Sequence, residues 1–289
     1  NIKSNVIKNE FISFLQDIEL DYSLKSNRDI FNLIINYFYQ TGNISEAYNL
    51  LNNRSDIDEE YFNFYKTIEI NYYLSTLKLE NVCNIKNDIS PQAKINNLLI
   101  EKIDIFCLVL EDKISEASLL NSIMMESEVN IDQNFQNLYS LITSADKIQQ
   151  VNNFSFEEFK DNDLIFLYSA MSRIAEVPLD KSFLELDPDN LAIPIILNKS
   201  NPIDLRIKAA NKTYAKGAIS IDSLAALYQS VDFDSNQLDN PEETIKSLSN
   251  EKELLMAYYF QLINIQFSPL ERVKALIDFW NFAKENNTE

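Results

Sequence analysis

The sequence predicts an all-α protein made of many short helices, and three observations support that class. Apolar residues recur at the spacing of amphipathic helices, helix starts and ends carry typical capping residues, and one helix–turn–helix pattern returns at a fixed interval. The chain has 289 residues, of which 46% are hydrophobic, with 18 Phe and 14 Tyr. That composition is ample for a packed core and differs from that of a disordered chain.

Two apolar stripes predict helices near the start of the chain. Each stripe is expected to face the core: Val6, Phe11, Phe14 and Leu15 in the first, and Ile30, Leu33, Ile34, Tyr37 and Phe38 in the second. Gly42 and Gly217, the two glycines of the chain, are each expected to close a helix. The turn after a helix often needs a positive φ, which glycine adopts at the least steric cost.

A short motif recurs after these helices. Residues 42–47 read Gly-Asn-Ile-Ser-Glu-Ala, residues 113–117 read Lys-Ile-Ser-Glu-Ala, and residues 217–220 read Gly-Ala-Ile-Ser. The anchors Ile44, Ile114 and Ile219 are separated by 114 − 44 = 70 and 219 − 114 = 105 residues, which are two and three times 35. Leu79 occupies the missing position. The alignment makes Ala47, Val82 and Ala117 equivalent, and predicts that they are the small core residue of the second helix. It predicts Leu50, Ile85 and Leu120 as the next core residue of that helix.

A helix pair with a tight turn that recurs near 34 residues resembles the tetratricopeptide repeat. The resemblance is best over residues 28–126, about three repeats, and it implies helical hairpins stacked as a right-handed α-solenoid with a groove for a protein or peptide. The chain departs from the family pattern in the tryptophan and tyrosine of the first helix and in the closing proline. An irregular helical bundle with similar hairpins is the alternative. The second half resembles uncharacterised helical-repeat proteins of alphaproteobacteria that carry export signals.

The remaining organisation is read from the prolines. We expect repeats over residues 1–150 and a second helical region over residues 151–289, with an irregular segment near 176–202 that contains Pro178, Pro188, Pro194 and Pro202. Residues 187–190, Asp-Pro-Asp-Asn, are expected to form a turn. A last helix is expected to start at Ser268-Pro269, with Glu271 as the acid of a capping box. Its predicted inward face is Leu270, Val273, Leu276, Ile277 and Trp280.

Composition excludes several function classes. With 0 His and 2 Gly, the chain has no imidazole for catalysis or metal binding and no glycine-rich phosphate loop, so we expect neither an enzyme nor a cofactor. The net charge of 25 − 44 = −19 disfavours nucleic acid and anionic lipid and favours basic partners. The longest apolar run, about residues 191–197, is too short for a transmembrane segment.

Two local patterns are candidate sites. Cys83 and Cys107 lack metal-ligand or CxxC spacing, so they are either a disulfide or two buried thiols. The stretch that starts at Asp232 carries oxygen side chains at positions one, three, five and twelve, the spacing of a calcium loop; these are Asp232, Asp234, Asn236 and Glu243. Gln237 stands where that loop needs glycine, so the alternative is an acidic connector between helices.

Aromatic clusters predict the function. Tyrosine is enriched at interfaces because it joins a large contact area to a polar tip, and the candidate partner-binding residues are Tyr37, Tyr61, Tyr65, Tyr72 and Tyr73. The alternative is that these rings are packed between stacked helices. We expect a scaffold or adaptor that binds a basic or neutral protein segment; alternatives are a subunit of a larger assembly, including a homo-oligomer, or a helical enzyme that uses carboxylates. The cysteine pair and Asn1 at the first position favour an exported or periplasmic bacterial protein.

Overall fold

The computed structural model describes residues 5–21, 23–53, 60–85, 96–127, 131–144, 156–157, 162–186, 190–266 and 268–285. Every regular element in these ranges is a helix, which confirms the all-α class. The chain forms two compact units, Asn1–Asn201 and Pro202–Glu289. This division lies later than the expected boundary at residue 150, because a helix at 165–175 packs into the first unit.

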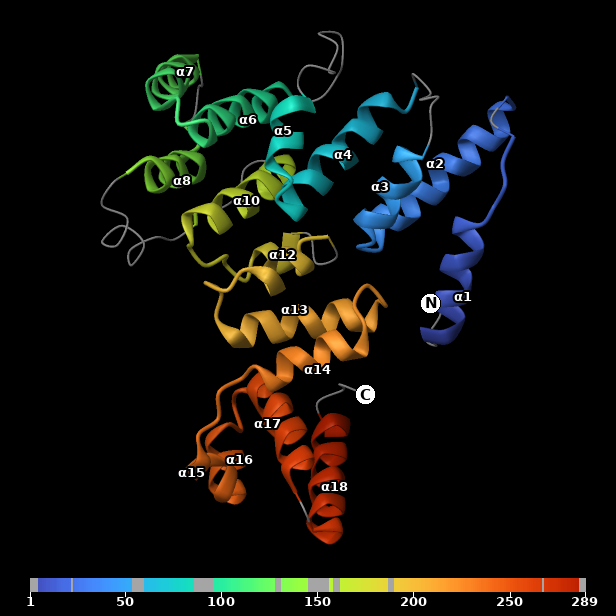
Figure 1. Ribbon diagram of the computed structural model, residues 1–289, viewed down its shortest axis with the longest axis vertical. Coiled ribbons are helices and arrows are strands. Elements are labelled where there is room, and N and C mark those ends of the chain that lie inside the picture. The colour runs from blue at the N-terminus through green and yellow to red at the C-terminus, as the bar shows by residue number, and fades with distance from the viewer. Residues whose placement is uncertain are drawn as a thin grey trace. The chain divides into compact units, whose positions relative to one another are not determined.

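The first unit contains a series of helices in which α2 to α7 each contact the next in chain order. Figure 1 shows the hairpins α2/α3, α4/α5 and α6/α7 following one another from right to left. The bounds are α1 Asn5–Gln16, α2 Lys25–Gln40, α3 Ile44–Asn52, α4 Phe62–Thr76, α5 Leu79–Ile85, α6 Asn97–Leu110, α7 Ile114–Ser127, α8 Gln133–Thr143, a 3₁₀ helix η2 Asn162–Leu164, α10 Ile165–Ala175, α11 Phe183–Leu186 and α12 Ala192–Leu197.

The three hairpins share one turn geometry. A residue one or two positions after the first helix has a positive φ in each hairpin, and these residues, Gly42 (80°), Leu77 (54°) and Asp112 (60°), are 35 positions apart. In each turn the next amide donates to a carbonyl five residues earlier at 2.9 Å, the pattern that satisfies the last carbonyls of a helix. Gly217, with φ 75°, closes α13 in the same way in the second unit. The predicted glycine turns are therefore confirmed, and two further turns adopt the geometry without glycine.

The repeat alignment predicts burial correctly at one position and less well at the next. Ala47, Val82 and Ala117 are all fully buried, as expected for a small residue where two helices approach closely. At the next position Ile85 is buried and Leu50 is half-buried, but Leu120 is exposed. The prediction for Leu120 is wrong because α7 packs mainly on α6, and no other helix of the described part of the chain covers the side of α7 that carries Leu120.

Helix α10 is the centre of the first unit. Residues 165–172 are all buried, because α10 contacts α4, α6, α8 and α12. A buried polar network fixes it: the Lys102 ammonium on α6 lies 2.8 Å from the Asp132 carboxylate, which also accepts a hydrogen bond from the Tyr168 hydroxyl on α10. Asp132 caps α8 through the amide of Phe135 at 3.2 Å. One carboxylate thus connects three helices, and removal of it would leave a fully buried ammonium.

Residues 176–202 form an irregular segment with the short helices α11 and α12. Buried asparagines satisfy its backbone: Asn198 donates to the Val177 carbonyl at 3.0 Å, and Asn201 accepts from the Leu179 amide at 2.6 Å. Asn190 donates to the Tyr39 carbonyl at 2.9 Å and so ties the segment to α2. The predicted turn at residues 187–190 lies largely outside the described residues.

The second unit consists of α13 Ile203–Ala215, α14 Ile221–Gln229, α15 Ser235–Asp239, α16 Pro241–Ser247, α17 Lys252–Ile265 and α18 Pro269–Glu285. Helices α13, α14 and α17 contact one another, and α18 packs on α17. The Gln261 side chain donates to the carbonyls of Tyr228 and Val231 at 2.8 Å, which satisfies the end of α14. The Tyr228 hydroxyl donates to Asn211 at 2.6 Å, and burial raises the pKa of Tyr228 to about 12.

Helix α18 starts at Pro269 as predicted, but its inward face is not the predicted one. Ala275 and Ala283 are buried, and the rings of Phe279 and Phe282 lie 5.8 and 6.0 Å from the Tyr259 ring of α17. The five residues expected inside, Leu270, Val273, Leu276, Ile277 and Trp280, are all exposed. The small alanines allow α18 to approach α17 closely, and this contact leaves the larger aliphatic face in solvent.

Candidate protein-binding surfaces

The predicted partner-binding tyrosines do not form one surface. Tyr65, Tyr72 and Tyr73 on α4 are buried, so they offer little area to a partner. Tyr61 is half-buried, and its hydroxyl donates to the Asp29 carboxylate of α2 at 2.8 Å. Tyr37 is half-buried on α2. Of the five, Tyr37 and Tyr61 therefore remain within reach of another protein.

The buried tyrosines hold α3 against α4. The rings of Tyr48 and Tyr72 stack with centroids 3.9 Å apart, and the hydroxyls of Tyr48 and Tyr73 are 3.0 Å apart. The Lys78 ammonium lies 4.8 Å from the Tyr72 ring centroid and donates to its hydroxyl at 3.0 Å, a hydrogen bond that raises the pKa of Lys78. Burial raises the pKa of Tyr73, so its hydroxyl stays protonated. A protonated phenol of this kind is not an activated nucleophile, so the Tyr73 hydroxyl acts as a hydrogen-bonding group between α3 and α4.

An apolar surface lies beside Tyr37. We call the set Phe11, Phe14, Ile30, Leu33 and Tyr37 the α1–α2 surface. The ring of Phe11 on α1 meets that of Tyr37 edge to face at 5.7 Å, and α1 is also bound to α3 by a 2.6 Å hydrogen bond from Gln16 to Glu46. Phe11, Phe14, Ile30 and Leu33 are all exposed. All four were expected to face the core, and that expectation is wrong. Helix α2 buries the adjacent face, with Phe31, Ile34, Ile35 and Phe38, and leaves Ile30 and Leu33 outside.

A second apolar surface lies on α18. We call Leu270, Val273, Leu276, Ile277 and Trp280 the α18 strip; they recur every three or four residues along one side of the helix. Sequence reasoning found these residues but assigned them to the core. Both surfaces share a signal that the sequence does contain: α2 and α18 have apolar residues around more of their circumference than one contact can cover.

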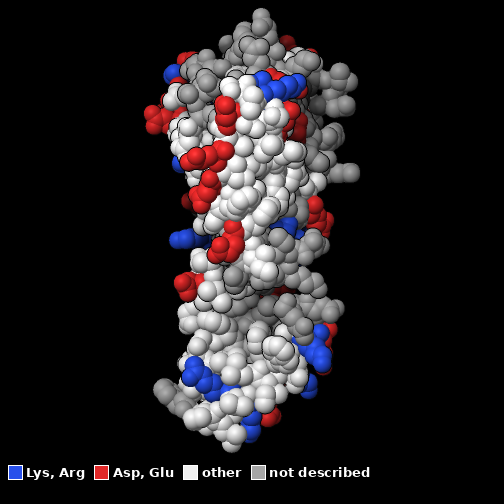
Figure 2. All heavy atoms as spheres, turned by 90° about the vertical axis from the view of Figure 1, so that its right-hand side faces the viewer, with Lys and Arg blue, Asp and Glu red and all other residues white. Residues whose placement is uncertain are grey.

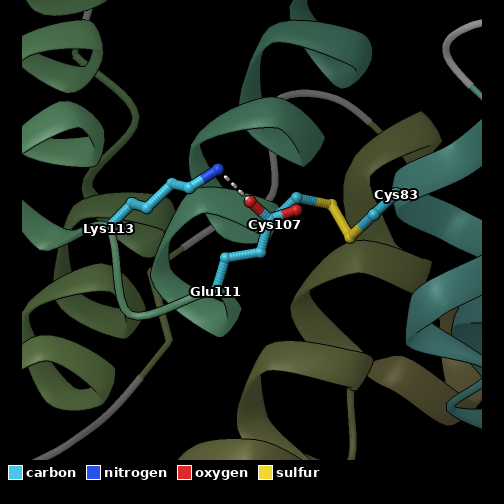
Figure 3. Close-up of a disulfide and its surroundings, with 4 residues drawn as sticks. All are labelled: Cys83, Cys107, Glu111 and Lys113. Carbon is cyan, nitrogen blue, oxygen red and sulfur yellow. Dashed lines mark hydrogen bonds and ion pairs between the residues drawn. A yellow bond between two sulfur atoms is a disulfide. The ribbon is translucent and has the colours of Figure 1, made fainter.

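The cysteines form a disulfide. Cys83 on α5 is joined to Cys107 on α6, with their Cα atoms 5.6 Å apart (Figure 3). Cys107 is buried, and near the end of α6 the Lys113 ammonium contacts the Glu111 carboxylate at 2.7 Å. The bond closes a loop of 24 residues between two consecutive helices. It therefore stabilises the contact between the second and third hairpins.

The calcium interpretation is not supported. The Asp234 carboxylate accepts from the Gln237 amide at 2.8 Å, and Gln237 accepts in return from the Asp234 amide at 2.9 Å, which is a capping box for α15. Asn236 is part of α15 and accepts from Asn240 at 2.9 Å. Because these stretches are helical, Asp232, Asp234, Asn236 and Glu243 do not belong to one open loop. Within the described residues, no group of three or more His, Cys, Asp or Glu is placed to hold a metal ion.

Comparison with known proteins gives no relative. No protein-family model matches the chain, and no curated protein or solved structure matches it. Among the helices that the structure describes, none has the length and apolarity needed to cross a membrane. The function must therefore be inferred from the chemistry of the exposed surfaces.

Proposed function

We propose that this protein is a non-catalytic scaffold or adaptor that holds a protein or peptide segment on the α1–α2 surface. The observation that carries the proposal is the contact of the exposed Phe11 ring with the Tyr37 ring. Exposed Leu33 and Ile30 lie one and two turns before Tyr37 on α2, and exposed Phe14 lies one turn after Phe11 on α1. Contiguous exposed apolar side chains are uncommon on a monomeric protein and mark binding sites. Aromatic and aliphatic anchors of this kind supply most of the binding energy at protein interfaces.

Charge supports a basic or neutral partner. The chain carries 25 basic and 44 acidic side chains, so its field attracts cations and repels phosphate backbones and anionic lipids. Asp29 and Glu46 are near the α1–α2 surface, bonded to Tyr61 and Gln16. A segment with apolar anchors and flanking Lys or Arg would gain both burial and favourable encounter.

We also propose that the hairpins α2/α3, α4/α5 and α6/α7 are divergent tetratricopeptide-like repeats of a right-handed solenoid. Support comes from the turn that returns at residues 42, 77 and 112 and from the buried small residues Ala47, Val82 and Ala117. The contacts of each helix with the next, from α2 to α7, also support a stacked array. The packing of α10 on α4, α6 and α8 adds a layer that a simple array lacks.

The disulfide favours export. A bond between Cys83 and Cys107 persists in an oxidising compartment and is reduced in most bacterial cytoplasms. We therefore propose that the protein is periplasmic or secreted. Thiol labelling of protein taken from its own cells, with and without prior reduction, tests this: labelling without reduction would contradict it.

The α1–α2 surface is tested by Leu33→Asn, which keeps the net charge. Leu119→Asn on α7 is the matched control, because Leu33 and Leu119 are 65% and 63% exposed. Protein purified from its own organism at low salt should retain a stoichiometric partner, and the affinity for that partner should fall about tenfold or more with Leu33→Asn only. High salt should weaken the binding of a basic partner. Equal binding by the two variants would contradict the proposal.

A further inference from the structure

The α18 strip has no covering helix among the described residues. Trp280, the only tryptophan of the chain, is 65% exposed there, and Leu270 is equally exposed. Figure 2 looks onto the side where α18 lies in Figure 1, and its lowest part is mainly uncharged, with charged side chains toward the edges. Exposure of five large apolar side chains in one row to water is unfavourable, and covering them with another surface lowers the free energy.

We propose that a second copy of this chain covers the α18 strip, with the two α18 helices packed antiparallel. The proposal concerns the second unit alone, whereas the proposed partner site is on the first unit. It therefore goes beyond the proposed function, and either can fail without the other.

Local charge favours a second copy. Helix α18 has three basic residues, Arg272, Lys274 and Lys284, and three acidic residues, Glu271, Asp278 and Glu285. The helix is thus neutral in a chain whose net charge is −19. Two strongly acidic copies repel each other over most of their surfaces, so they can approach most closely where each is neutral.

The arrangement of these charges favours the antiparallel orientation. Lys274 is one turn from Leu270 and from Ile277, and Asp278 is one turn after Lys274, so the two charges follow one edge of the strip. Both are two positions from Leu276, near the middle of the strip. A two-fold axis there places Lys274 of each copy opposite Asp278 of the other, whereas in a parallel pair this edge would face the opposite edge of the partner strip and the two charges would not meet.

The size of the strip sets the expected affinity. The five side chains expose roughly 500 Å² per copy, less than the ~800 Å² per partner of a standard stable interface. The dimer should therefore be weak, with a dissociation constant on the order of 10 µM or higher. Trp280 reports on it directly, because burial of an exposed indole shifts its emission to shorter wavelength.

The first test is sedimentation velocity of the full chain, over concentrations that bracket this constant, together with Trp280 emission. We expect a monomer–dimer equilibrium and a blue shift that rises with concentration. Ile277→Asn should weaken association about tenfold, and Ile123→Asn on α7 should leave it unchanged; the two isoleucines are both 54% exposed. A monomer at every concentration, or equal weakening by both variants, would overturn the proposal.

The second test addresses orientation with Lys274→Asp and Asp278→Lys. Each variant alone places like charges across the proposed two-fold axis and should associate less than the unmodified chain. An equimolar mixture pairs two acidic positions with two basic ones and should associate more strongly than either variant alone. Charges that interact only within their own helix would give no such recovery. A mixture that associates no more strongly than either variant alone therefore rules out the antiparallel dimer.

Discussion

Helices α10 and α18 are both rich in large apolar residues, yet their environments are opposite. In α10 every residue from 165 to 172 is buried, including Ser169 and Ser172, because four other helices surround it. In α18 the residues buried against α17 are Ala275 and Ala283, and the strip from Leu270 to Trp280 faces solvent. The number of neighbours that the fold supplies, more than the composition of a helix, determines how much of it is buried.

The largest loss of stability is expected when the buried polar network that holds α10 is removed. Asp132→Ala leaves Lys102 buried without its carboxylate and also removes the cap of α8, so we expect a loss of about 3–5 kcal/mol in the free energy of unfolding. Urea unfolding followed by circular dichroism measures it. The double variant Lys102→Met/Asp132→Asn removes both charges and should lose less. An equal loss in the double variant would show that the buried charge is not the cause.

A matched pair of leucines tests the comparison directly. Leu167 of α10 is fully buried and Leu276 of α18 is exposed. Leu167→Ala should cost about 2–5 kcal/mol through the lost burial and the cavity, whereas Leu276→Ala should cost less than about 0.5 kcal/mol. Thermal unfolding at low protein concentration, where copies do not associate, provides the measurement. Similar losses for the two would contradict the exposure of the strip.

Reduction of the disulfide should affect the two units differently, because the disulfide lies in the unit of α10 and not in that of α18. Reduction of the Cys83–Cys107 bond should cost about 3 kcal/mol, as expected for a loop of 24 residues. Calorimetry with and without reductant should show a lower transition for the first unit and an unchanged one for the second. Cys83→Ala/Cys107→Ala should be insensitive to reductant. A shift of both transitions would mean that the units unfold together.

The smallest effect is expected at the turns, which the two units share. Gly217→Ala forces a side chain into positive φ and should cost about 1 kcal/mol, while Asp112→Gly relieves the same conformation and should gain up to about 1 kcal/mol. Chemical unfolding of the two variants gives both values. Opposite signs at equivalent positions of the repeat would support a common turn, and equal signs would not.

Local features of the fold could be predicted from the sequence. Gly42, Gly217 and Pro269 mark helix ends where the structure has them, because capping depends on a few adjacent residues. The face of α18 could not be predicted, because Phe279 and Phe282 give it a second apolar side and helical periodicity does not choose between the two. The contact with α17 chooses the side with small alanines.

The candidate site shows the same limit. Burial of Tyr65, Tyr72 and Tyr73 depends on how α4 packs on the preceding hairpin, because the Tyr65 ring meets that of Phe31 on α2 and the rings of Tyr72 and Tyr73 meet that of Tyr48 on α3. No local pattern around the tyrosines contains that information. The exposure of Leu33 likewise depends on which face of α2 meets α3, so the α1–α2 surface emerges only from tertiary contacts.

The Cys83–Cys107 bond has a mechanical consequence. When the chain is pulled from its two ends, tension passes through the sulfur atoms and bypasses residues 84–106. Because an extended residue spans about 3.5 Å, complete extension of the oxidised chain falls short of that of the reduced chain by about 80 Å. Under load the oxidised chain would therefore keep Cys83 of α5 and Cys107 of α6 together after the surrounding helices have unfolded, and reductant would release the additional length.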